Sequence, residues 1–253
     1  MASGALAALV AMLLYAQFIQ PTQRAITQRD IDQAVLHTLT TKQMPSPEAR
    51  AFERVRRSVV RVRGMASGKN GEADTEDGVG TGVVIVDSGI ILTNRHVVYG
   101  ADKLKVVFFD GLESDATVVG VLAEHDLAVL QAKTLPDDLA AATLRSTHNL
   151  APGDHVVAVG FPFGIGPSVS SGVVSGLKRE FRSPGGERVL TNLIQFDAAA
   201  NPGSSGGPLL TMDGEVVGIV TAILNPSQQR VFIGIGFAVP IENAAAAVGI
   251  HPF

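Results

Sequence analysis

The sequence predicts an all-β fold built from antiparallel barrels or a sandwich. The chain has 253 residues, among them 27 glycines and 13 prolines, and little helical periodicity follows residue 58. Short apolar stretches recur there without helical patterns of about 10–15 residues between them, which argues against a parallel α/β sheet. Apolar residues make up 46% of the chain and charged residues 17%, so most of it can fold around a core.

The first segment, residues 1–23, has the properties of a membrane anchor. It contains no charged side chain, and GALAALVAMLLYAQFI (4–19) is an almost unbroken apolar run. A spanning helix needs about 20 such residues, so the run is at the lower limit. A cleaved signal and a buried soluble helix are the alternatives, although a basic start and a clear cleavage site are missing. Arg24 and Arg29 nominally favour a cytoplasmic body.

Residues 24–57 predict a helical extension that links this segment to the β domain, residues 58–253. Thr27 and Asp30 have the spacing of a helix cap, and apolar residues then recur every four positions, at Ile31, Val35 and Leu39. Pro45 ends this helix. A second helix is predicted to start at Ser46-Pro47-Glu48, with serine as N-cap and proline first in the helix, and to run to about Arg57.

A basic stretch joins the extension to the β domain. Six arginines fall between residues 50 and 63, at positions 50, 54, 56, 57, 61 and 63, against the single Glu53. One interpretation is contact with anionic lipid head groups beside the anchor. We favour the other, a solvated face whose arginines pair with the acidic loop Glu72, Asp74, Glu76 and Asp77, because surface charge runs usually have this role.

The strands are predicted from alternation and from β-branched runs. In SVVRVR, Val60 and Val62 alternate with arginines, as expected of a half-buried strand. Further strands are predicted at 82–86, 89–93, 105–109, 116–122, 127–132, 155–160, 168–177, 189–196, 215–223 and 231–239, with a late helix at 241–250.

Composition excludes several classes of function. The chain has no cysteine, and its six histidines are scattered, so neither a thiolate nucleophile nor a metal site is expected, and no cofactor is indicated. A net charge of −4 gives no electrostatic basis for binding nucleic acid.

NPGSSGGPLL (201–210) raises the possibility of a nucleophilic serine. A serine needs a neighbouring base and free backbone N–H groups to act in acyl transfer, and a glycine-rich turn can offer the latter. Gly203–Gly207 also matches the G-x-S-x-G elbow of α/β-hydrolases. That fold requires a helix directly after the serine and a later acid and histidine. Gly206-Gly207-Pro208 disfavours such a helix. The one histidine after Ser205 is His251, two residues from the end, so we reject the elbow.

Candidate partners for the serine lie upstream. TNRHVV places His96 just after an apolar strand, and HDLAVL places Asp126 at the head of another. Alone, each residue would be read as an ordinary polar strand end or turn. Together with the serine they occur in the order His, Asp, Ser, which is the order of the chymotrypsin-type triad.

The chain resembles the HtrA/Deg family of trypsin-like serine proteases across roughly residues 58–242. The resemblance is carried by GTGVVIVDSGIILTNRHVV, HDLAVL, VVAVGFPFG, SVSSGVVSGLKRE and IQFDAAANPGSSGGPLLTMDGEVVGIVTA, ending in IGIGFAVPI. It implies two six-stranded antiparallel β-barrels with the active site between them. The family motif G-N-S-G-G-P matches Ser205 to the nucleophile, whereas Ser204 replaces the usual asparagine. Phe161 is a second departure, where the family often has asparagine.

The resemblance also assigns roles. His96 would be the general base, Asp126 its orienting acid, and the N–H groups of Gly203 and Ser205 the oxyanion hole. Ala199 stands where trypsin-like enzymes that prefer basic residues carry an acid, so we expect cleavage after small or medium aliphatic residues. The pocket walls would be Ala199, Ala200, Asn201, Ile233, Gly234, Ile235 and Gly236.

The function expected from this resemblance is an endopeptidase of unfolded or damaged proteins. It would be tethered to a membrane, act on the periplasmic side in protein quality control, and form a trimer through residues 44–60. Most relatives carry a C-terminal PDZ domain, so this chain is either a PDZ-less member or a truncated one. The alternative function is a non-catalytic, chaperone-like peptide-binding protein on a protease scaffold.

Overall fold

The computed structural model describes residues 10–12, 15, 25–42, 44–68, 75–183, 189–224 and 231–247. The chain divides into two compact units, Met1–Pro45 and Ser46–Phe253. The predicted anchor, residues 1–23, lies outside the described residues except at positions 10–12 and 15. Among the described residues, no helix has both the length and the apolar character needed to cross a membrane.

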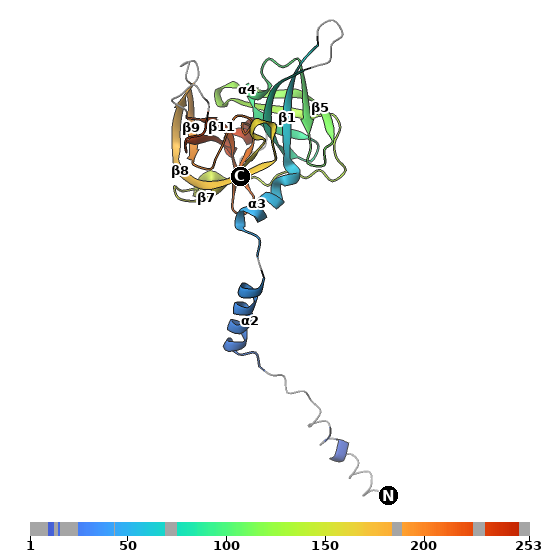
Figure 1. Ribbon diagram of the computed structural model, residues 1–253, viewed down its shortest axis with the longest axis vertical. Coiled ribbons are helices and arrows are strands. Elements are labelled where there is room, and N and C mark those ends of the chain that lie inside the picture. Colours follow the sequence, from blue (N-terminus) through green and yellow to red (C-terminus); the bar gives the residue numbers. More distant parts are fainter. Residues whose placement is uncertain are drawn as a thin grey trace. The chain divides into compact units, whose positions relative to one another are not determined.

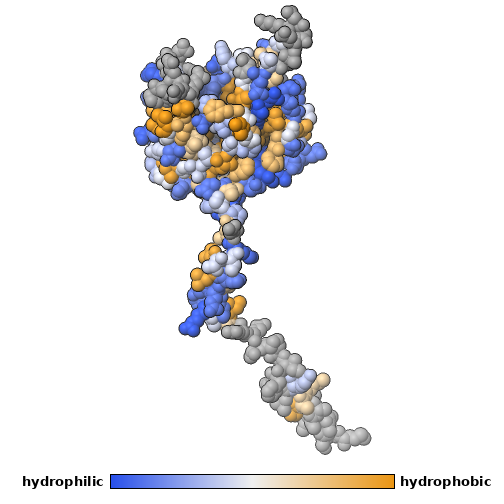
Figure 2. Space-filling view, in the orientation of Figure 1, coloured by the Kyte–Doolittle hydropathy of each residue, from blue (hydrophilic) through white to orange (hydrophobic). Residues whose placement is uncertain are grey.

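The first unit contains helix α2 (Gln28–Thr41). Its capping box is confirmed: the Thr27 side chain accepts a hydrogen bond from the N–H of Asp30, while the Asp30 carboxylate accepts one from the N–H of Thr27. These contacts from Thr27 hold the pKa of Asp30 below its usual value. The apolar residues spaced by four are exposed, and apolar and polar patches lie side by side on the helix (Figure 2).

The second unit begins with helix α3 (Pro47–Val55), which the sequence grouped with the preceding extension. Ser46 caps it as predicted, since its hydroxyl accepts a hydrogen bond from the N–H of Ala49 at 3.1 Å. Ala51 and Val55 are fully buried in a core that also contains barrel residues. The helix is therefore packed onto the β structure, and the 3-10 turn η1 (Arg56–Ser58) leads directly into the first strand.

The predicted pair of six-stranded barrels is confirmed (Figure 1). The N-terminal barrel closes in the strand order β1-β2-β3-β6-β5-β4, and every pairing is antiparallel. Its strands are β1 (Val59–Ala66), β2 (Thr75–Val86), β3 (Ile90–Asn94), β4 (Lys103–Val107), β5 (Glu113–Leu122) and β6 (Leu127–Ala132).

The C-terminal barrel closes in the order β10-β11-β12-β9-β8-β7 and is likewise antiparallel. Its strands are β7 (His155–Gly160), β8 (Ser168–Arg182), β9 (Val189–Phe196), β10 (Pro208–Thr211), β11 (Val216–Ile223) and β12 (Gly236–Pro240). Helix α4 (Arg95–Val98) follows β3, and helix α5 (Ile241–Ala247) follows β12. The remaining 3-10 turns are η2 (Ala123–His125), η3 (Thr147–Asn149) and η4 (Pro162–Gly164).

In several strands, alternate side chains are buried in two different apolar cores, one on each face of the strand. In β6, Ala128 and Leu130 belong to the interior of the N-terminal barrel, whereas Leu127 and Val129 belong to a second core. That second core also contains Val157, Val159, Val216 and Ile219 of the C-terminal barrel, so it lies between the barrels. Both faces of such strands are buried, which explains why LAVLQA and HVVAVG read as continuous apolar runs.

Several predicted strands have other bounds in the structure: β2 starts at Thr75 and not at residue 82, β4 spans Lys103–Val107 and not 105–109, and β8 continues past residue 177 to Arg182. The strand predicted at 231–239 begins only at Gly236, because Gly234 takes a left-handed φ of 92° in an irregular segment ahead of it. Strand β10 had no separate prediction: it is only four residues long and follows the serine motif at once. The late helix is confirmed from Ile241 to Ala247, and residues 248–250 lie outside the described part.

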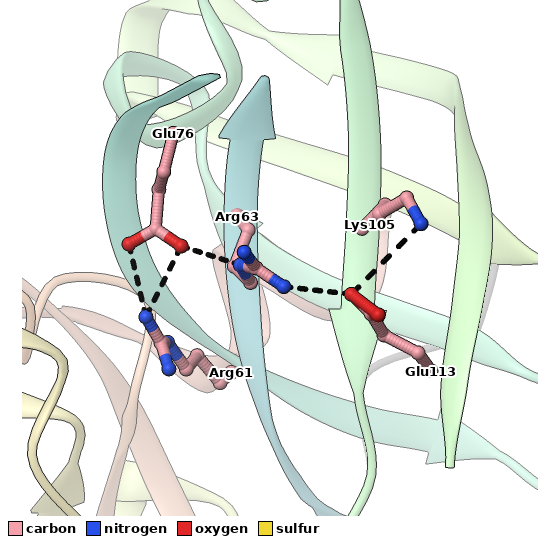
Figure 3. A network of polar contacts seen from close by, with 5 residues as sticks. All are labelled: Arg61, Arg63, Glu76, Lys105 and Glu113. Atoms are coloured by element: carbon pink, nitrogen blue, oxygen red, sulfur yellow. Dashed lines mark hydrogen bonds and ion pairs between the residues drawn. The ribbon is translucent and has the colours of Figure 1, made fainter. Parts of the chain in front are cut away.

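Five arginines of the basic stretch are paired with acidic residues. Arg61 and Arg63 on β1 both contact Glu76 of β2, and Arg63 also reaches Glu113 of β5 at 2.6 Å, as Figure 3 shows. Ion pairs also join three further arginines to acids: Arg54 to Asp213, Arg56 to Glu53 and Arg57 to Asp138. These contacts favour the paired-face interpretation over lipid contact. Glu76 and Asp77 belong to β2 and not to a loop as predicted, and Glu72 and Asp74 lie outside the described residues.

Candidate active site

The histidine and the aspartate form a directly bonded pair. His96 lies in α4, two residues beyond the end of β3, and Asp126 follows η2 just before β6. Nδ1 of His96 is 2.5 Å from Oδ2 of Asp126, and the N–H of His96 donates to Oδ1 at 3.2 Å. With Nδ1–H directed at the carboxylate, Nε2 is left as the basic nitrogen of the ring.

The carboxylate of Asp126 is held inside the protein. Asp126 is only 3% exposed and has a left-handed φ of 53°. Its Oδ2 accepts a second hydrogen bond from the hydroxyl of Thr221, on β11 of the other barrel, at 3.3 Å. Its carbonyl oxygen accepts from the Arg95 N–H and from the Asn94 amide. A buried charge is tolerated when it is bonded in this way, and these bonds fix its direction.

The candidate nucleophile lies in the loop between β9 and β10, against both barrels. The N–H of Thr81 on β2 donates to the carbonyl oxygen of Ser205 at 2.8 Å. The N–H of Gly206 donates to the carbonyl oxygen of Val220 at 2.8 Å. Val220 is the neighbour of Thr221, so the serine loop and the aspartate contact consecutive residues of β11.

The carbonyl groups of residues 202–205 in this loop accept hydrogen bonds, whereas only every second N–H group of residues 203–206 donates one within the part of the chain that the structure describes. The carbonyl oxygens of Pro202 and Ser204 accept hydrogen bonds, from Phe163 and Gly207 respectively, at 2.8 and 3.0 Å. The N–H groups of the same two peptide units belong to Gly203 and Ser205, and neither donates to any atom of the described residues. The two predicted oxyanion donors are therefore held in place and unengaged.

The serine and the histidine of the candidate triad are not hydrogen-bonded to each other in the described part of the chain. Within the described residues, no hydrogen bond joins the Ser205 hydroxyl to the His96 ring. Catalytic hydrogen bonds are often long in the absence of substrate and tighten in the complex.

The predicted pocket segments 199–201 and 233–236 come from two loops that touch. The N–H of Phe232 lies 3.4 Å from Oδ1 of Asn201. Ala199 is exposed, and its carbonyl oxygen accepts a hydrogen bond from Ser170 of β8 at 2.7 Å. The remaining residues differ in burial: Ile233 and Gly234 are exposed, Ile235 is half-buried, and Ala200 and Gly236 are buried in the C-terminal barrel.

Sequence reasoning missed the threonines that support the site. Thr81 and Thr221 are buried and contact the serine loop and the aspartate, respectively. Thr221 lies in the strand predicted at 215–223, where a threonine in a β-branched run is ordinary strand composition, whereas Thr81 lies in β2 just ahead of the strand predicted at 82–86. Only the pairing of the barrels gives these hydroxyls their partners.

Gly206 is required at the contact between the serine loop and the N-terminal barrel. Its φ is 85°, and a Cβ there would overlap the carbonyl oxygen of Thr81 and the hydroxyl of Thr93. We expect Gly206→Ala to lower the free energy of unfolding by more than about 3 kcal/mol, because backbone atoms of both barrels must separate. Thermal unfolding followed by circular dichroism measures this.

Gly111→Ala is the matched control. Gly111 has a similar φ of 89° with no atom within 4 Å of an added Cβ. It isolates the conformational cost, about 1–2 kcal/mol. Equal losses in the two variants would contradict the close approach at Gly206.

Comparison with known proteins identifies the family of this chain. The family model described as a trypsin-like peptidase domain matches residues 80–219. The chain is 43% identical over 172 residues to a probable periplasmic serine protease do/HhoA-like of Haemophilus influenzae, covering 68% of this chain and 36% of that protein. It is 43% identical over 169 residues to the periplasmic pH-dependent serine endoprotease DegQ of Escherichia coli, covering 66% and 36%. The chain thus spans about a third of the length of these relatives.

A solved structure gives the same result. The HtrA-type protease AlgW with a tripeptide superposes with a TM-score of 0.70 at 36% identity, covering 81% of this chain and 63% of that one. The region matched by the family model covers more than half of the chain and includes the histidine, the aspartate and the serine loop. The chain therefore belongs to the trypsin-like peptidases, and within them to the HtrA/Deg family of serine proteases.

Proposed function

We propose that this chain is a serine endopeptidase that hydrolyses peptide bonds in unfolded or damaged proteins outside the cytoplasm. Its relatives are named periplasmic serine proteases and endoproteases, which supports the reaction class and the compartment. The observation that supports the proposal is the pair of unengaged N–H groups at Gly203 and Ser205, in a loop that binds β11 next to the residue bonded to Asp126, the partner of the His96 ring.

In the first step the Ser205 hydroxyl oxygen attacks the scissile carbonyl carbon, and Nε2 of His96 takes the hydroxyl proton. The carbonyl oxygen becomes an oxyanion that accepts hydrogen bonds from the N–H groups of Gly203 and Ser205. Each donor contributes about 3–4 kcal/mol to the transition state. The carboxylate of Asp126 stabilises the imidazolium ion formed at the same time.

In the second step the C–N bond breaks, and His96 gives its proton to the leaving amine. The acyl group stays on the Ser205 oxygen as an ester. Water then attacks this ester while His96 takes a proton from it, and the proton returns to Ser205 as the acid product leaves. No metal or cofactor takes part in this scheme.

The proposal is tested by digestion of unfolded casein together with labelling by a fluorophosphonate. We expect cleavage, its loss after labelling, and the phosphonyl adduct on Ser205 in the mass spectrum of a proteolytic digest. An adduct on Ser204, or on neither serine, would contradict the assignment. Casein binding without cleavage would favour the chaperone-like alternative.

We propose a pocket floor without charge, because Ala199 stands where a preference for basic residues requires an acid. A peptide library should show cleavage after small or medium aliphatic residues. In Ala199→Asp, kcat/KM for substrates with lysine or arginine before the scissile bond should rise about 10- to 100-fold, since one charge-assisted hydrogen bond contributes roughly 1.5–3 kcal/mol. A wild-type preference for lysine or arginine would contradict the proposal.

We also propose that residues 1–23 anchor the protein to a membrane and that residues 44–60 support a trimer. The apolar run at 4–19 supports the anchor. The expected result is recovery of the full chain in the membrane fraction, with the mass of three chains after extraction in mild detergent. A protein washed off by alkaline carbonate would contradict the anchor, and a monomer mass would contradict the trimer.

A further inference from the structure

Thr81 is a residue of the N-terminal barrel that contacts the loop of the candidate oxyanion hole. It lies in β2 and is fully buried. Its hydroxyl donates a hydrogen bond to the carbonyl oxygen of Gly203 at 2.7 Å and accepts one from the N–H of Phe161 at 3.0 Å. Its N–H donates to the carbonyl oxygen of Ser205 at 2.8 Å. One side chain and its own backbone thus contact both sides of the nucleophile loop.

The loop needs an external support at Gly203. This residue must be glycine, because its φ is 100° and a Cβ would overlap the carbonyl oxygen of Phe161. Glycine is also the residue whose backbone rotates most freely. The N–H that would stabilise the oxyanion therefore belongs to a residue with little conformational restriction of its own, and its direction depends on how the neighbouring peptide units are held.

The Thr81 hydroxyl holds these peptide units from two sides. Directly, it fixes the carbonyl of Gly203, whose peptide unit is also fixed at its other end by the bond from Ser204 N–H to the Asn201 carbonyl at 2.8 Å. Indirectly, it fixes the backbone of Phe161, which starts the turn whose Phe163 N–H binds the carbonyl of Pro202 at 2.8 Å. The peptide units on both sides of the Gly203 Cα thus depend on one hydroxyl group.

We propose that Thr81 is a positioning residue for the oxyanion hole: its hydroxyl, supplied by the opposite barrel, aims the Gly203 N–H at the developing oxyanion. The inference rests on the proposed function and extends it to a residue that does not touch the substrate. Valine has nearly the same shape and can neither donate nor accept, so Thr81→Val leaves the Gly203 carbonyl and the Phe161 N–H buried without that partner. Serine keeps the hydroxyl and loses only a methyl group.

The test compares steady-state kinetics per active site, with active sites counted by the end point of fluorophosphonate labelling. We expect Thr81→Val to lower kcat by about 10- to 100-fold, less than the 10²- to 10³-fold loss of an oxyanion donor itself, with KM changed less than about threefold. Binding of a peptide aldehyde, which places an oxyanion in the hole, should weaken in proportion to kcat/KM. Thr81→Ser should stay within about threefold of the wild type.

Ser58→Ala is the matched control for a merely structural role. The Ser58 hydroxyl is also buried and donates at 2.7 Å, to the carbonyl oxygen of Ala140. Its loss should lower the melting temperature, as Thr81→Val does, and leave kcat per active site unchanged. If Thr81→Val does not fold, Thr81→Cys replaces it, because a thiol is a weak donor and should give an intermediate kcat.

Several outcomes would overturn the inference. It fails if Thr81→Val, or Thr81→Cys in its place, keeps the wild-type kcat per active site, if only KM changes, or if Thr81→Ser is as slow as Thr81→Val. The Ser205→Ala variant separates this failure from that of the proposed function. If Ser205→Ala still cleaves, both proposals fall; if it is inactive while Thr81→Val is fully active, only the role of Thr81 falls.

Discussion

Replacing Ser205 by alanine is expected to lower kcat for a peptide substrate by about 10⁶-fold, the loss measured when the serine of another serine protease is removed. The variant keeps the unengaged N–H groups and the His96–Asp126 pair but has no oxygen to form the acyl-enzyme. Binding of substrate should persist, so KM should change little. The measurement is hydrolysis of a fluorogenic peptide and of casein, with wild type and variant at equal concentration.

Ser204→Ala is the control for this variant. Ser204 is the adjacent serine, and its hydroxyl oxygen accepts a hydrogen bond from the N–H of Asn201 at 3.3 Å within the same loop. Its removal should cost no more than about tenfold, because a weak loop contact is worth roughly 1 kcal/mol. A larger loss from Ser204→Ala than from Ser205→Ala would show that the wrong serine was assigned.

Replacing Asp126 by asparagine is expected to lower kcat by about 10⁴-fold, as the corresponding change does in a trypsin-like enzyme. The carboxylate accepts hydrogen bonds from the His96 ring, the His96 N–H and the Thr221 hydroxyl. An amide NH₂ in its place donates to Nδ1 and leaves the proton on Nε2, so the ring cannot take the proton of the serine. The shape of the site is unchanged.

Thr221→Val is the comparison for this variant. It removes one of the hydrogen bonds to the Asp126 carboxylate, at 3.3 Å, and leaves the bond to the His96 ring in place. A loss of about tenfold or less is expected, since one neutral hydrogen bond contributes roughly 0.5–1.5 kcal/mol. Equal losses in the two variants would mean that Asp126 acts mainly through packing and not through the tautomer of the ring.

Strand composition made most of the fold predictable. Runs such as LAVLQA and HVVAVG could be recognised because strands buried on both faces are continuously apolar. The short strand β10 was not predicted as a separate strand, because it has only four residues, Pro208–Thr211, and follows the serine motif directly. The start of β12 was placed too early because VFIGIG has strand composition, although Gly234 adopts a left-handed turn conformation there.

The candidate site was predictable only in part, for a physical reason. His96, Asp126 and a glycine-flanked serine occur in the order of the chymotrypsin-type triad, and the resemblance to the HtrA/Deg motif selects Ser205 over Ser204. The bond between His96 and Asp126 then follows from the fold. The supporting hydroxyls of Thr81 and Thr221 do not stand out, because their roles arise from contacts across barrels that no local pattern encodes.

The apolar core between the two barrels has a consequence for engineering. Leu127 or Ile219 would be exposed to water if the N-terminal or the C-terminal barrel, respectively, were expressed alone. An exposed apolar patch of this kind promotes aggregation. Chimeras that exchange one barrel between relatives must therefore keep the residues that both barrels contribute to this core compatible, or replace them together.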